Sequence, residues 1–196
     1  MISFVLTLIA AYLIGSIPTG VVLTRLSGAE DVRKSGSGNI GATNVYRVAG
    51  RRLGILTLLG DVLKGLVPLW YLGTSFHLPD ARLALVAAAL FLGHLYPIYL
   101  RFKGGKGVAT ALGVLLVLSP LAIVPALLIF AGVLWRWRYV SAASVSAAAS
   151  IPLLVWLFER SLPTTAAALF IAVMVIVRHR VNIKRLLDGT ENRFKA

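Results

Sequence analysis

Three short motifs hold most of the residues in this chain whose types and spacing could do chemistry. The first motif (37–47) reads Ser-Gly-Asn-Ile-Gly-Ala-Thr-Asn-Val-Tyr-Arg, the second motif (103–107) reads Lys-Gly-Gly-Lys-Gly, and the third motif (179–191) reads His-Arg-Val-Asn-Ile-Lys-Arg-Leu-Leu-Asp-Gly-Thr-Glu. Loops rich in glycine, asparagine, lysine and arginine bind phosphates, because backbone N–H groups and cationic side chains can both face the anion. Each motif lies next to the end of a long apolar segment, so we expect a site where a phosphorylated molecule meets a lipid chain.

The first motif combines glycine turns with polar side chains. Repeated glycines let backbone N–H groups turn toward an anion without obstruction by a Cβ atom. Neutral hydrogen-bonding groups come from Ser37, Asn39, Thr43 and Asn44. Arg47 adds a planar guanidinium that matches the geometry of a phosphate. The alternative is a flexible polar loop that caps the following helix.

The second motif lies at the junction of two apolar segments and carries two cations, Lys103 and Lys106. It lacks the spacing of a P-loop, and no parallel sheet is available to hold one. A glycine turn that leads into a helix N-terminus still directs backbone N–H groups and the positive end of the helix dipole at an anion. The alternative is a basic turn whose charge only sets the topology of the membrane segments.

The third motif begins where the last apolar segment ends. If that helix continues to Leu187, His179 and Asn182 lie on one face, since residues three apart are neighbours on a helix. Arg185 extends the same face, and Gly189 can end the helix as its C′ residue. The alternative is a basic helix end whose long side chains reach out of the membrane to the headgroups.

Asp61 and Lys64 lie inside an apolar segment, near its expected cytoplasmic end. Charged side chains at membrane depth are costly, and they face a cavity or a partner. Their spacing of three residues favours an ion pair on one helix face. Two roles fit this pair: a scaffold for the site, or a purely structural contact.

The composition is typical of an integral membrane protein. Of the 196 residues 58% are hydrophobic, and several apolar runs reach or approach the ~20 residues that cross a bilayer. We therefore expect a single polytopic membrane domain over residues 1–196. The chain has no cysteine and three scattered histidines, which excludes disulfides and thiolate nucleophiles, and we predict no metal and no cofactor. The net charge of +13 indicates contact with anionic headgroups rather than with nucleic acid.

The distribution of basic residues predicts the orientation of the chain. The apolar segments run over 2–24, 53–75, 82–100, 107–135, 140–158 and 163–177. Lysine and arginine gather between 25 and 52, between 101 and 106, and from 178 onward, while the other loops are nearly bare. By the positive-inside rule, the three motifs and the C-terminus are cytoplasmic and the N-terminus is outside. The first segment lacks a basic n-region and is too long for a signal peptide, so we expect it to be retained.

The number of spans follows from parity. The second and third motifs share a side only if an even number of spans separates them, yet 107–177 shows three apolar blocks. The block 107–135 contains Ser119-Pro120, and proline breaks or kinks a helix. Two short helices over 107–118 and 121–135 restore parity, so we predict an all-α bundle of seven transmembrane helices. The alternative is five or six spans with a re-entrant segment.

In the first span, the stretch from Gly15 to Gly20 with its proline predicts a kink and close helix packing.

Together these residues resemble one family, the bacterial acyl-phosphate:glycerol-3-phosphate acyltransferases known as PlsY. The resembling stretches are 37–47, 93–110 and 179–191, with further likeness at 15–20 and 61–65. The resemblance implies transfer of a fatty acyl group from acyl-phosphate to the 1-hydroxyl of glycerol 3-phosphate, which gives lysophosphatidic acid and phosphate for phospholipid synthesis. It also implies a bacterial plasma (inner) membrane location, with the active site on the cytoplasmic side.

The resemblance also assigns roles to residues. It gives importance for activity to Ser37 and Arg47 of the first motif and to His179 and Asn182 of the third. It links Gly104, Gly105 and Gly107 to binding of glycerol 3-phosphate, and it makes the position of Glu191 structural. The family lacks the His-x4-Asp dyad of other glycerolipid acyltransferases, and no histidine of this chain has an aspartate five residues on.

An acyl-phosphate is a mixed anhydride with an activated carbonyl, so the main task is to hold two phosphorylated substrates together despite their repulsion. We expect Arg47, Lys106 and Arg185 to hold phosphates, and Ser37, His179 and Asn182 to orient the glycerol hydroxyls or the carbonyl oxygen. A substrate phosphate takes the hydroxyl proton, and the acyl tail lies in a groove open to lipid. The expected partners are these two substrates and membrane lipids, with no obligatory protein partner.

Three other functions remain open from the sequence. Kinked helices and charges at membrane depth also fit a transporter or channel for an organic phosphate, although no inverted repeat is evident. A non-catalytic lipid-binding scaffold would not need three glycine-rich motifs. An enzyme that takes its acyl group from acyl-CoA or an acyl carrier protein is the nearest alternative to the acyl-phosphate enzyme.

Overall fold

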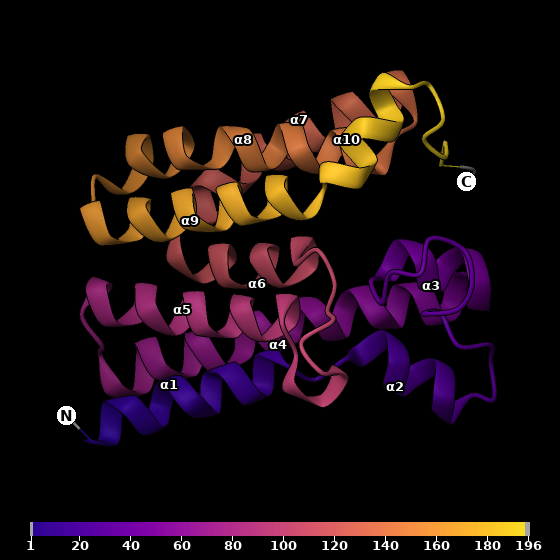
Figure 1. Cartoon of the computed structure of the whole chain (residues 1–196). Helices are drawn as coiled ribbons and strands as arrows, with labels where there is room; N and C mark the ends of the chain where they lie inside the picture. Colours follow the sequence, from indigo (N-terminus) through magenta and orange to yellow (C-terminus); the bar gives the residue numbers. More distant parts are fainter. Residues whose placement is uncertain (1, 195–196) are drawn as a thin grey trace. The chain divides into compact units, whose positions relative to one another are not determined.

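The computed structural model describes residues 2–194, and within these residues its regular secondary structure is all helical, with ten α-helices and one short 3-10 helix (Figure 1). The helices are α1 (Ile2–Gly15), α2 (Thr19–Leu26), α3 (Ala42–Ala49), α4 (Arg51–Phe76), α5 (Asp80–Leu95), η1 (Ile98–Leu100), α6 (Val108–Leu118), α7 (Pro120–Trp137), α8 (Val140–Glu159), α9 (Leu162–Arg178) and α10 (Arg180–Leu187). The chain divides into two compact units, one ending at Val117 and one starting at Leu118.

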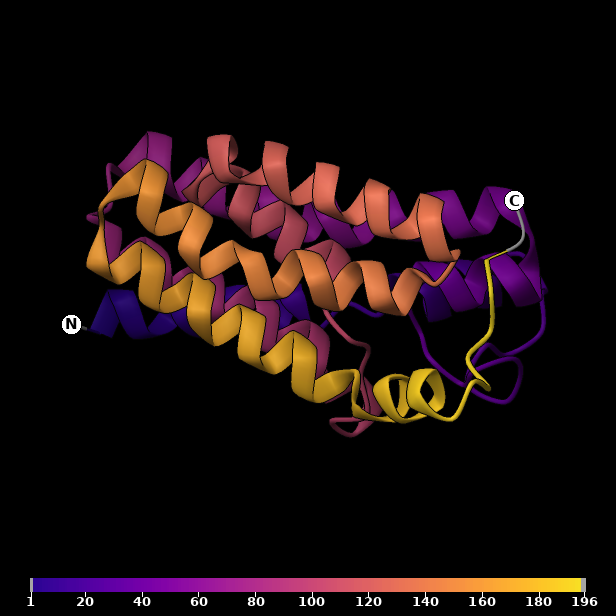
Figure 2. The same cartoon turned by 90° about the horizontal axis from the view of Figure 1, so that it is seen from above.

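The first unit contains helices α1 to α5, η1 and nearly all of α6. Its helices run back and forth: α5 ends and α6 begins beside the middle of α4, where Gly65 lies against Thr110, and the first half of α4 extends beyond them to α3 (Figures 1 and 2). The loop before α3, α3 itself and the loop between α5 and α6 all lie toward the end of the unit where α4 begins. We call it the motif end of the first unit, because the first and second motifs both lie there.

The first span is broken between α1 and α2, with a bend of 45°. Gly15 ends α1, and a Cβ atom added to it would collide with the backbone of Leu90 in α5. A Cβ atom on Gly93 of α5 would collide with the backbone of α1 at Tyr12. Small residues on both helices thus let two backbones approach closely, which confirms the predicted kink and close packing.

The second unit contains helices α7 to α10. The Ser119 hydroxyl donates to Glu159 Oε1 over 2.8 Å and ties the start of α7 to the end of α8. At the other end of the unit, the Ser141 hydroxyl at the start of α8 donates to Glu191 Oε1 over 2.8 Å, beyond α10. α7, α8 and α9 therefore run antiparallel to their neighbours, and α10 lies near the start of α8 (Figures 1 and 2).

In the described part of the chain, four helices are long and apolar enough to cross a membrane: α4, α5 extended to Leu100, α7 and α8. The bent pairs α1–α2 and α9–α10 raise the number of candidate spans to six. The predicted break at Pro120 is confirmed, since α6 ends at Leu118 and α7 starts at Pro120. α6 has 11 residues, and at ~1.5 Å per residue it is about half the ~30 Å of a bilayer core. The number of seven spans therefore stays a prediction.

The condition stated for the third motif, a helix that continues to Leu187, is not met. The last membrane helix does not continue smoothly to Leu187: it ends at Arg178, bends by 55° and resumes as α10. The His179 imidazole bonds the Val175 carbonyl oxygen through Nδ1 at 2.8 Å, and the ring is buried at the corner. The end of α10 agrees with prediction, since Gly189 has φ +69° and its N–H donates to the Leu186 carbonyl.

Candidate functional site

The first motif is folded around the side chain of Asn44. The Asn44 amide nitrogen donates to the carbonyl oxygens of Val32 (2.8 Å), Ser35 (3.1 Å) and Asn39 (2.9 Å). Its side-chain oxygen accepts the backbone N–H of Ser37 over 2.8 Å, and the whole residue is buried. Asn44 thus shapes the loop from inside, and its predicted binding of substrate stays a prediction.

Other polar groups of the first motif face outward. Ser37 and Arg47 are exposed, and within residues 2–194 their side chains have no hydrogen-bond or ion-pair partner. Asn39 accepts the N–H of Gly41 over 2.9 Å, and Thr43 is half-buried at the start of α3. Ser37 and Arg47 are therefore the exposed side chains of this motif that can reach a ligand without breaking a hydrogen bond or an ion pair.

A second arginine near this loop is already engaged. The Arg33 guanidinium lies 2.6 Å from Asp31 Oδ2, and this contact lowers the pKa of the Asp31 carboxyl to about 2. Because this pKa is lowered, the carboxylate stays ionised, and keeps its contact with Arg33, to a lower pH than a free aspartate would. Arg47 consequently differs from Arg33 in having an uncompensated positive charge.

The second motif folds back over the end of α5. The Gly105 N–H donates to the His94 carbonyl oxygen over 3.2 Å, and Gly107 has φ +80°, a conformation that favours glycine. A Cβ atom on Gly104 would collide with the carbonyl oxygens of His94 and Leu95, so this close approach requires glycine. The side chain of Lys103 is exposed and that of Lys106 is half-buried.

Beneath the second motif lies a buried polar cluster. Lys64 Nζ is 2.7 Å from Asp61 Oδ1 and donates to the Ile17 carbonyl oxygen over 2.7 Å. The Thr110 hydroxyl donates to the Asp61 carbonyl oxygen over 3.1 Å and lies 3.2 Å from His94 Nδ1. The predicted pair of Asp61 and Lys64 thus forms, and it joins α4 to the break between α1 and α2, where the Ile17 carbonyl oxygen also accepts the Thr19 N–H over 3.0 Å.

The third motif is organised by Glu191. Glu191 Oε1 accepts the Asn182 amide over 2.7 Å and the Ser141 hydroxyl over 2.8 Å. Asn182 is 9% exposed and His179 2%, so both are held inside rather than on a solvated helix face. Arg185 is half-buried, and its carbonyl oxygen accepts the Thr190 N–H over 2.8 Å beyond the helix end. These contacts support a structural role for Glu191.

The structure thus brings the first and second motifs to one end of the first unit, while the third motif belongs to the second unit. The convergence of all three motifs on one substrate pair stays a prediction. Sequence reasoning gave no role to His94, Thr110 or Ser141, which complete the two polar clusters. The sequence does mark His94, because it is an ionisable residue inside the apolar segment 82–100. An ionisable side chain at membrane depth needs a polar partner or a cavity, as Asp61 does.

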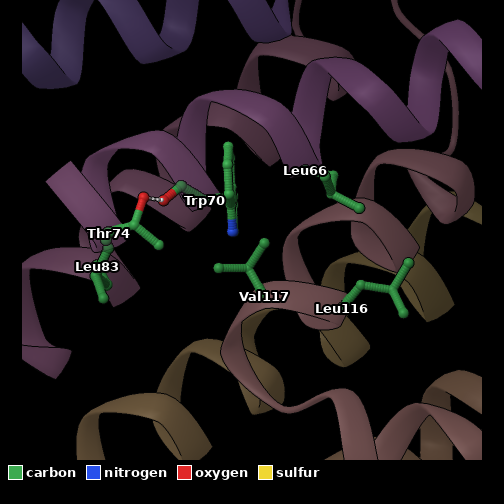
Figure 3. Close-up of a pocket in the computed structure, with 7 residues that line it drawn as sticks. Leu66, Trp70, Thr74, Leu83, Leu116 and Val117 are labelled. Atoms are coloured by element: carbon green, nitrogen blue, oxygen red, sulfur yellow. Dashed lines mark hydrogen bonds between the residues drawn. The ribbon is translucent and has the colours of Figure 1, made fainter.

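The first unit also has an apolar groove at the end opposite the motif end. Its volume is about 380 Å³, and it is lined by Leu66, Trp70, Gly73, Thr74, Leu83, Leu116 and Val117. Trp70 and Val117 face each other across it (Figure 3). The groove has no charged lining residue, so it suits a hydrocarbon chain rather than a phosphate. In residues 2–194, no three histidine, aspartate or glutamate side chains lie close enough to hold a metal ion.

Comparison with known proteins gives a consistent result. The family model described as glycerol-3-phosphate acyltransferase matches residues 5–189. The glycerol-3-phosphate acyltransferase of Syntrophotalea carbinolica is 62% identical over 196 residues, with full coverage of both chains. That of Geobacter sulfurreducens is 57% identical over 186 residues, 95% of each chain, and that of Fusobacterium nucleatum is 44% identical over 98% of this chain and 99% of its own.

Two solved structures are similar to this chain over nearly its whole length. Both are crystal structures of PlsY (YgiH), an integral membrane glycerol 3-phosphate acyltransferase. The glycerol 3-phosphate form has a TM-score of 0.93 at 42% identity, and the lysophosphatidic acid form has 0.91 at 41%. Each match covers 98% of this chain and 96% of the other.

Proposed function

Because the chain belongs to the PlsY-type glycerol-3-phosphate acyltransferase family, an enzyme family of the membrane that makes lysophosphatidic acid, we propose that it takes its acyl group from an acyl-phosphate and transfers it to the 1-hydroxyl of glycerol 3-phosphate. The observation that carries this proposal is the pairing of two glycine-rich basic motifs at one end of the first unit, in a chain matched by the family model over residues 5–189. The transporter and scaffold alternatives lose their support with this family membership.

The proposed reaction is a direct transfer between the two substrates. The 1-hydroxyl oxygen attacks the carbonyl carbon of the acyl-phosphate and forms the ester bond. The bond between that carbon and the phosphate oxygen breaks, and the released phosphate takes the hydroxyl proton. The carbonyl is already activated as a mixed anhydride, so the protein needs to supply binding and orientation, which together can lower a barrier by up to ~7–11 kcal/mol.

The residue roles in this proposal follow from exposure and charge. Arg47 and Lys106 bind phosphate groups, and Arg185 assists them. Gly104, Gly105 and Gly107 let the substrate phosphate approach the backbone of the second motif. Ser37 orients a glycerol hydroxyl, supported by its exposed and unpartnered side chain. His179 and Asn182 orient the carbonyl oxygen, supported by the fixed geometry that Glu191 gives to Asn182.

We further propose seven spans, with the N-terminus outside and the site on the cytoplasmic side. The four long helices and the two bent pairs supply six spans, and α6 supplies the seventh. The absence of cysteine makes a direct test possible, because single cysteines can be introduced without background. Leu26→Cys and Thr190→Cys should react with an impermeant thiol reagent only from the cytoplasmic side, and Ser75→Cys and Leu162→Cys only from outside.

The acyl tail extends, in this proposal, from the motif end toward the apolar groove. Support comes from the groove's lining, which includes Leu116 and Val117 of α6. Leu116 lies nine positions after Gly107, which corresponds to about 14 Å along a helix. An acyl chain that lies along α6 would therefore have its phosphate at the second motif and its hydrocarbon end in the apolar groove.

The donor assay tests the proposed function directly. Purified protein in lipid is given glycerol 3-phosphate with palmitoyl-phosphate, and with palmitoyl-CoA in parallel. We expect 1-acyl lysophosphatidic acid and an equal amount of inorganic phosphate from palmitoyl-phosphate, and no product from palmitoyl-CoA. Equal or faster product formation from palmitoyl-CoA would contradict the proposed donor.

A further inference from the structure

His94 has no role in the reaction proposed above, yet it is buried directly beneath the second motif. It lies in the last turn of α5 and is 3% exposed. Its ring lies against three residues from other elements of the first unit. Nδ1 faces Thr110 Oγ1 at 3.2 Å and Asp61 Oδ1 at 3.7 Å, while the Nε2 side of the ring faces Gly105.

The hydrogen-bond partners fix the direction of the imidazole. The Thr110 hydroxyl has one proton, and it donates this proton to the Asp61 carbonyl oxygen, which can only accept. The hydroxyl oxygen is then an acceptor toward His94, so the ring proton lies on Nδ1. This arrangement anchors one edge of the imidazole in the cluster and turns the other edge toward the second motif.

The contact at the other edge leaves no spare room. A Cβ atom added to Gly105 would collide with His94 Nε2, and it would lie 3.1 and 3.2 Å from the neighbouring ring carbons. Gly105 is not among the described glycines with positive φ, so space rather than backbone conformation makes glycine necessary there. The same residue pair is joined a second time through the hydrogen bond from the Gly105 N–H to the His94 carbonyl oxygen.

We propose that His94 is a positioning residue: its imidazole, anchored by Thr110 and Asp61, sets the height at which the glycine loop of the second motif lies above α5. This inference rests on the proposed function, because the loop is the part of that site given to glycerol 3-phosphate. A displaced loop would weaken binding of glycerol 3-phosphate. The melting temperature of such a variant would change less than its affinity for glycerol 3-phosphate, because the helices keep their positions.

The contact between Gly105 and His94 permits a test by mutual compensation. Gly105→Ala forces a methyl group against the imidazole and should lower kcat/KM for glycerol 3-phosphate by about 10- to 100-fold, as overpacking does in tightly packed sites. His94→Ala should raise KM for glycerol 3-phosphate by roughly tenfold, because the loop loses its support. The double variant should be at least about tenfold more active than Gly105→Ala, since the new methyl group then fills space that the ring has vacated.

Gly104 provides the matched control in the same loop. A Cβ atom on Gly104 would meet backbone carbonyl oxygens and Pro97, none of which is removed by truncating the His94 side chain. Adding His94→Ala to Gly104→Ala should therefore restore nothing. A second variant, His94→Gln, keeps a nitrogen or oxygen near the position of Nε2, and it should retain kcat/KM better than His94→Asn, whose amide is too short to reach the loop.

Two outcomes would overturn the inference while the wild-type enzyme remains active. One is a double variant no more active than Gly105→Ala. The other is equal rescue of Gly104→Ala and Gly105→Ala by His94→Ala. If His94→Ala does not fold, as measured by thermal unfolding in detergent, His94→Gln and His94→Asn decide the matter by their order of activity. Failure of the wild-type protein to use an acyl-phosphate would instead reject the proposed function.

Discussion

The side-chain amide of Asn182 donates a hydrogen bond to Glu191 Oε1 over 2.7 Å, although Asn182 lies within α10 and Glu191 lies in the segment that follows the helix. The same oxygen accepts the Ser141 hydroxyl, so one carboxylate holds the tail, α10 and the start of α8 together. Hydrogen bonds to charged groups contribute ~1.5–3 kcal/mol each, and a buried donor left without a partner adds to the loss.

The first prediction concerns this carboxylate. Glu191→Ala should lower the free energy of unfolding by about 3 kcal/mol, and Glu191→Gln, which keeps an accepting oxygen, by about 1 kcal/mol. Thermal unfolding in detergent measures both. Asp188→Ala is the matched control, because Asp188 is exposed and its carboxylate has no partner within residues 2–194. An equal loss in Asp188→Ala would refute the role of Glu191.

The second prediction concerns the buried ion pair of α4. Lys64→Met leaves the Asp61 carboxylate buried without its cation and should destabilise the protein by ~3–5 kcal/mol. Adding Asp61→Asn should restore part of that loss, because the remaining side chain is then neutral. The restoration is incomplete, since the Ile17 carbonyl still lacks the Lys64 ammonium. A double variant less stable than Lys64→Met would contradict this account.

The third prediction concerns Arg47, whose guanidinium is exposed and has no partner within residues 2–194. Arg47→Ala should lower kcat/KM for glycerol 3-phosphate by about 10- to 100-fold, the loss expected for a charged hydrogen bond. Arg47→Lys should retain part of the activity, because it keeps the charge and loses the planar fork. Arg51→Ala is the control, because Arg51 is also exposed and lies four positions further along the chain. We expect it to match the wild type, and a similar loss there would show that net charge, rather than Arg47, matters.

The sequence predicted the breaks in the helices where one residue type decides the backbone. Pro120 cannot continue a helix, and the stretch from Gly15 to Gly20 combines proline with small residues, so both breaks lie where they were expected. The bend at His179 was missed, because it has neither proline nor glycine and depends on a bond from the His179 imidazole to the Val175 carbonyl oxygen.

The sequence predicted which residues belong to the candidate site, but not the hydrogen bonds that join them. The motifs identify Asn44 and Glu191 as polar residues of interest, yet a list of residues cannot show that Asn44 points inward to three carbonyl oxygens. Nor can it show that His94 and Thr110 meet Asp61 across three helices. Such contacts join residues that lie 16 to 49 positions apart, and no periodicity encodes them.

The fourth prediction concerns the apolar groove. Gly73→Leu places a larger side chain beside Leu83, whose methyl carbons would lie 3.6 and 3.7 Å from the new Cβ atom, and so narrows the groove. The preferred acyl-phosphate should become shorter, as measured by relative kcat/KM for chains of 12 to about 18 carbons, while KM for glycerol 3-phosphate stays within about twofold. Gly132→Leu in α7, where a new Cβ atom has nothing within 4 Å, should leave chain preference unchanged. An unaltered preference in Gly73→Leu would exclude this groove as the end of the acyl site.

The central claim is that both phosphorylated substrates are held at the same time and react with each other. Initial rates measured over a grid of palmitoyl-phosphate and glycerol 3-phosphate concentrations test it most directly. We predict intersecting lines in double-reciprocal plots and no release of phosphate when glycerol 3-phosphate is omitted. Parallel lines, with a burst of phosphate in the absence of glycerol 3-phosphate, would reveal a covalent acyl-enzyme and contradict the direct transfer.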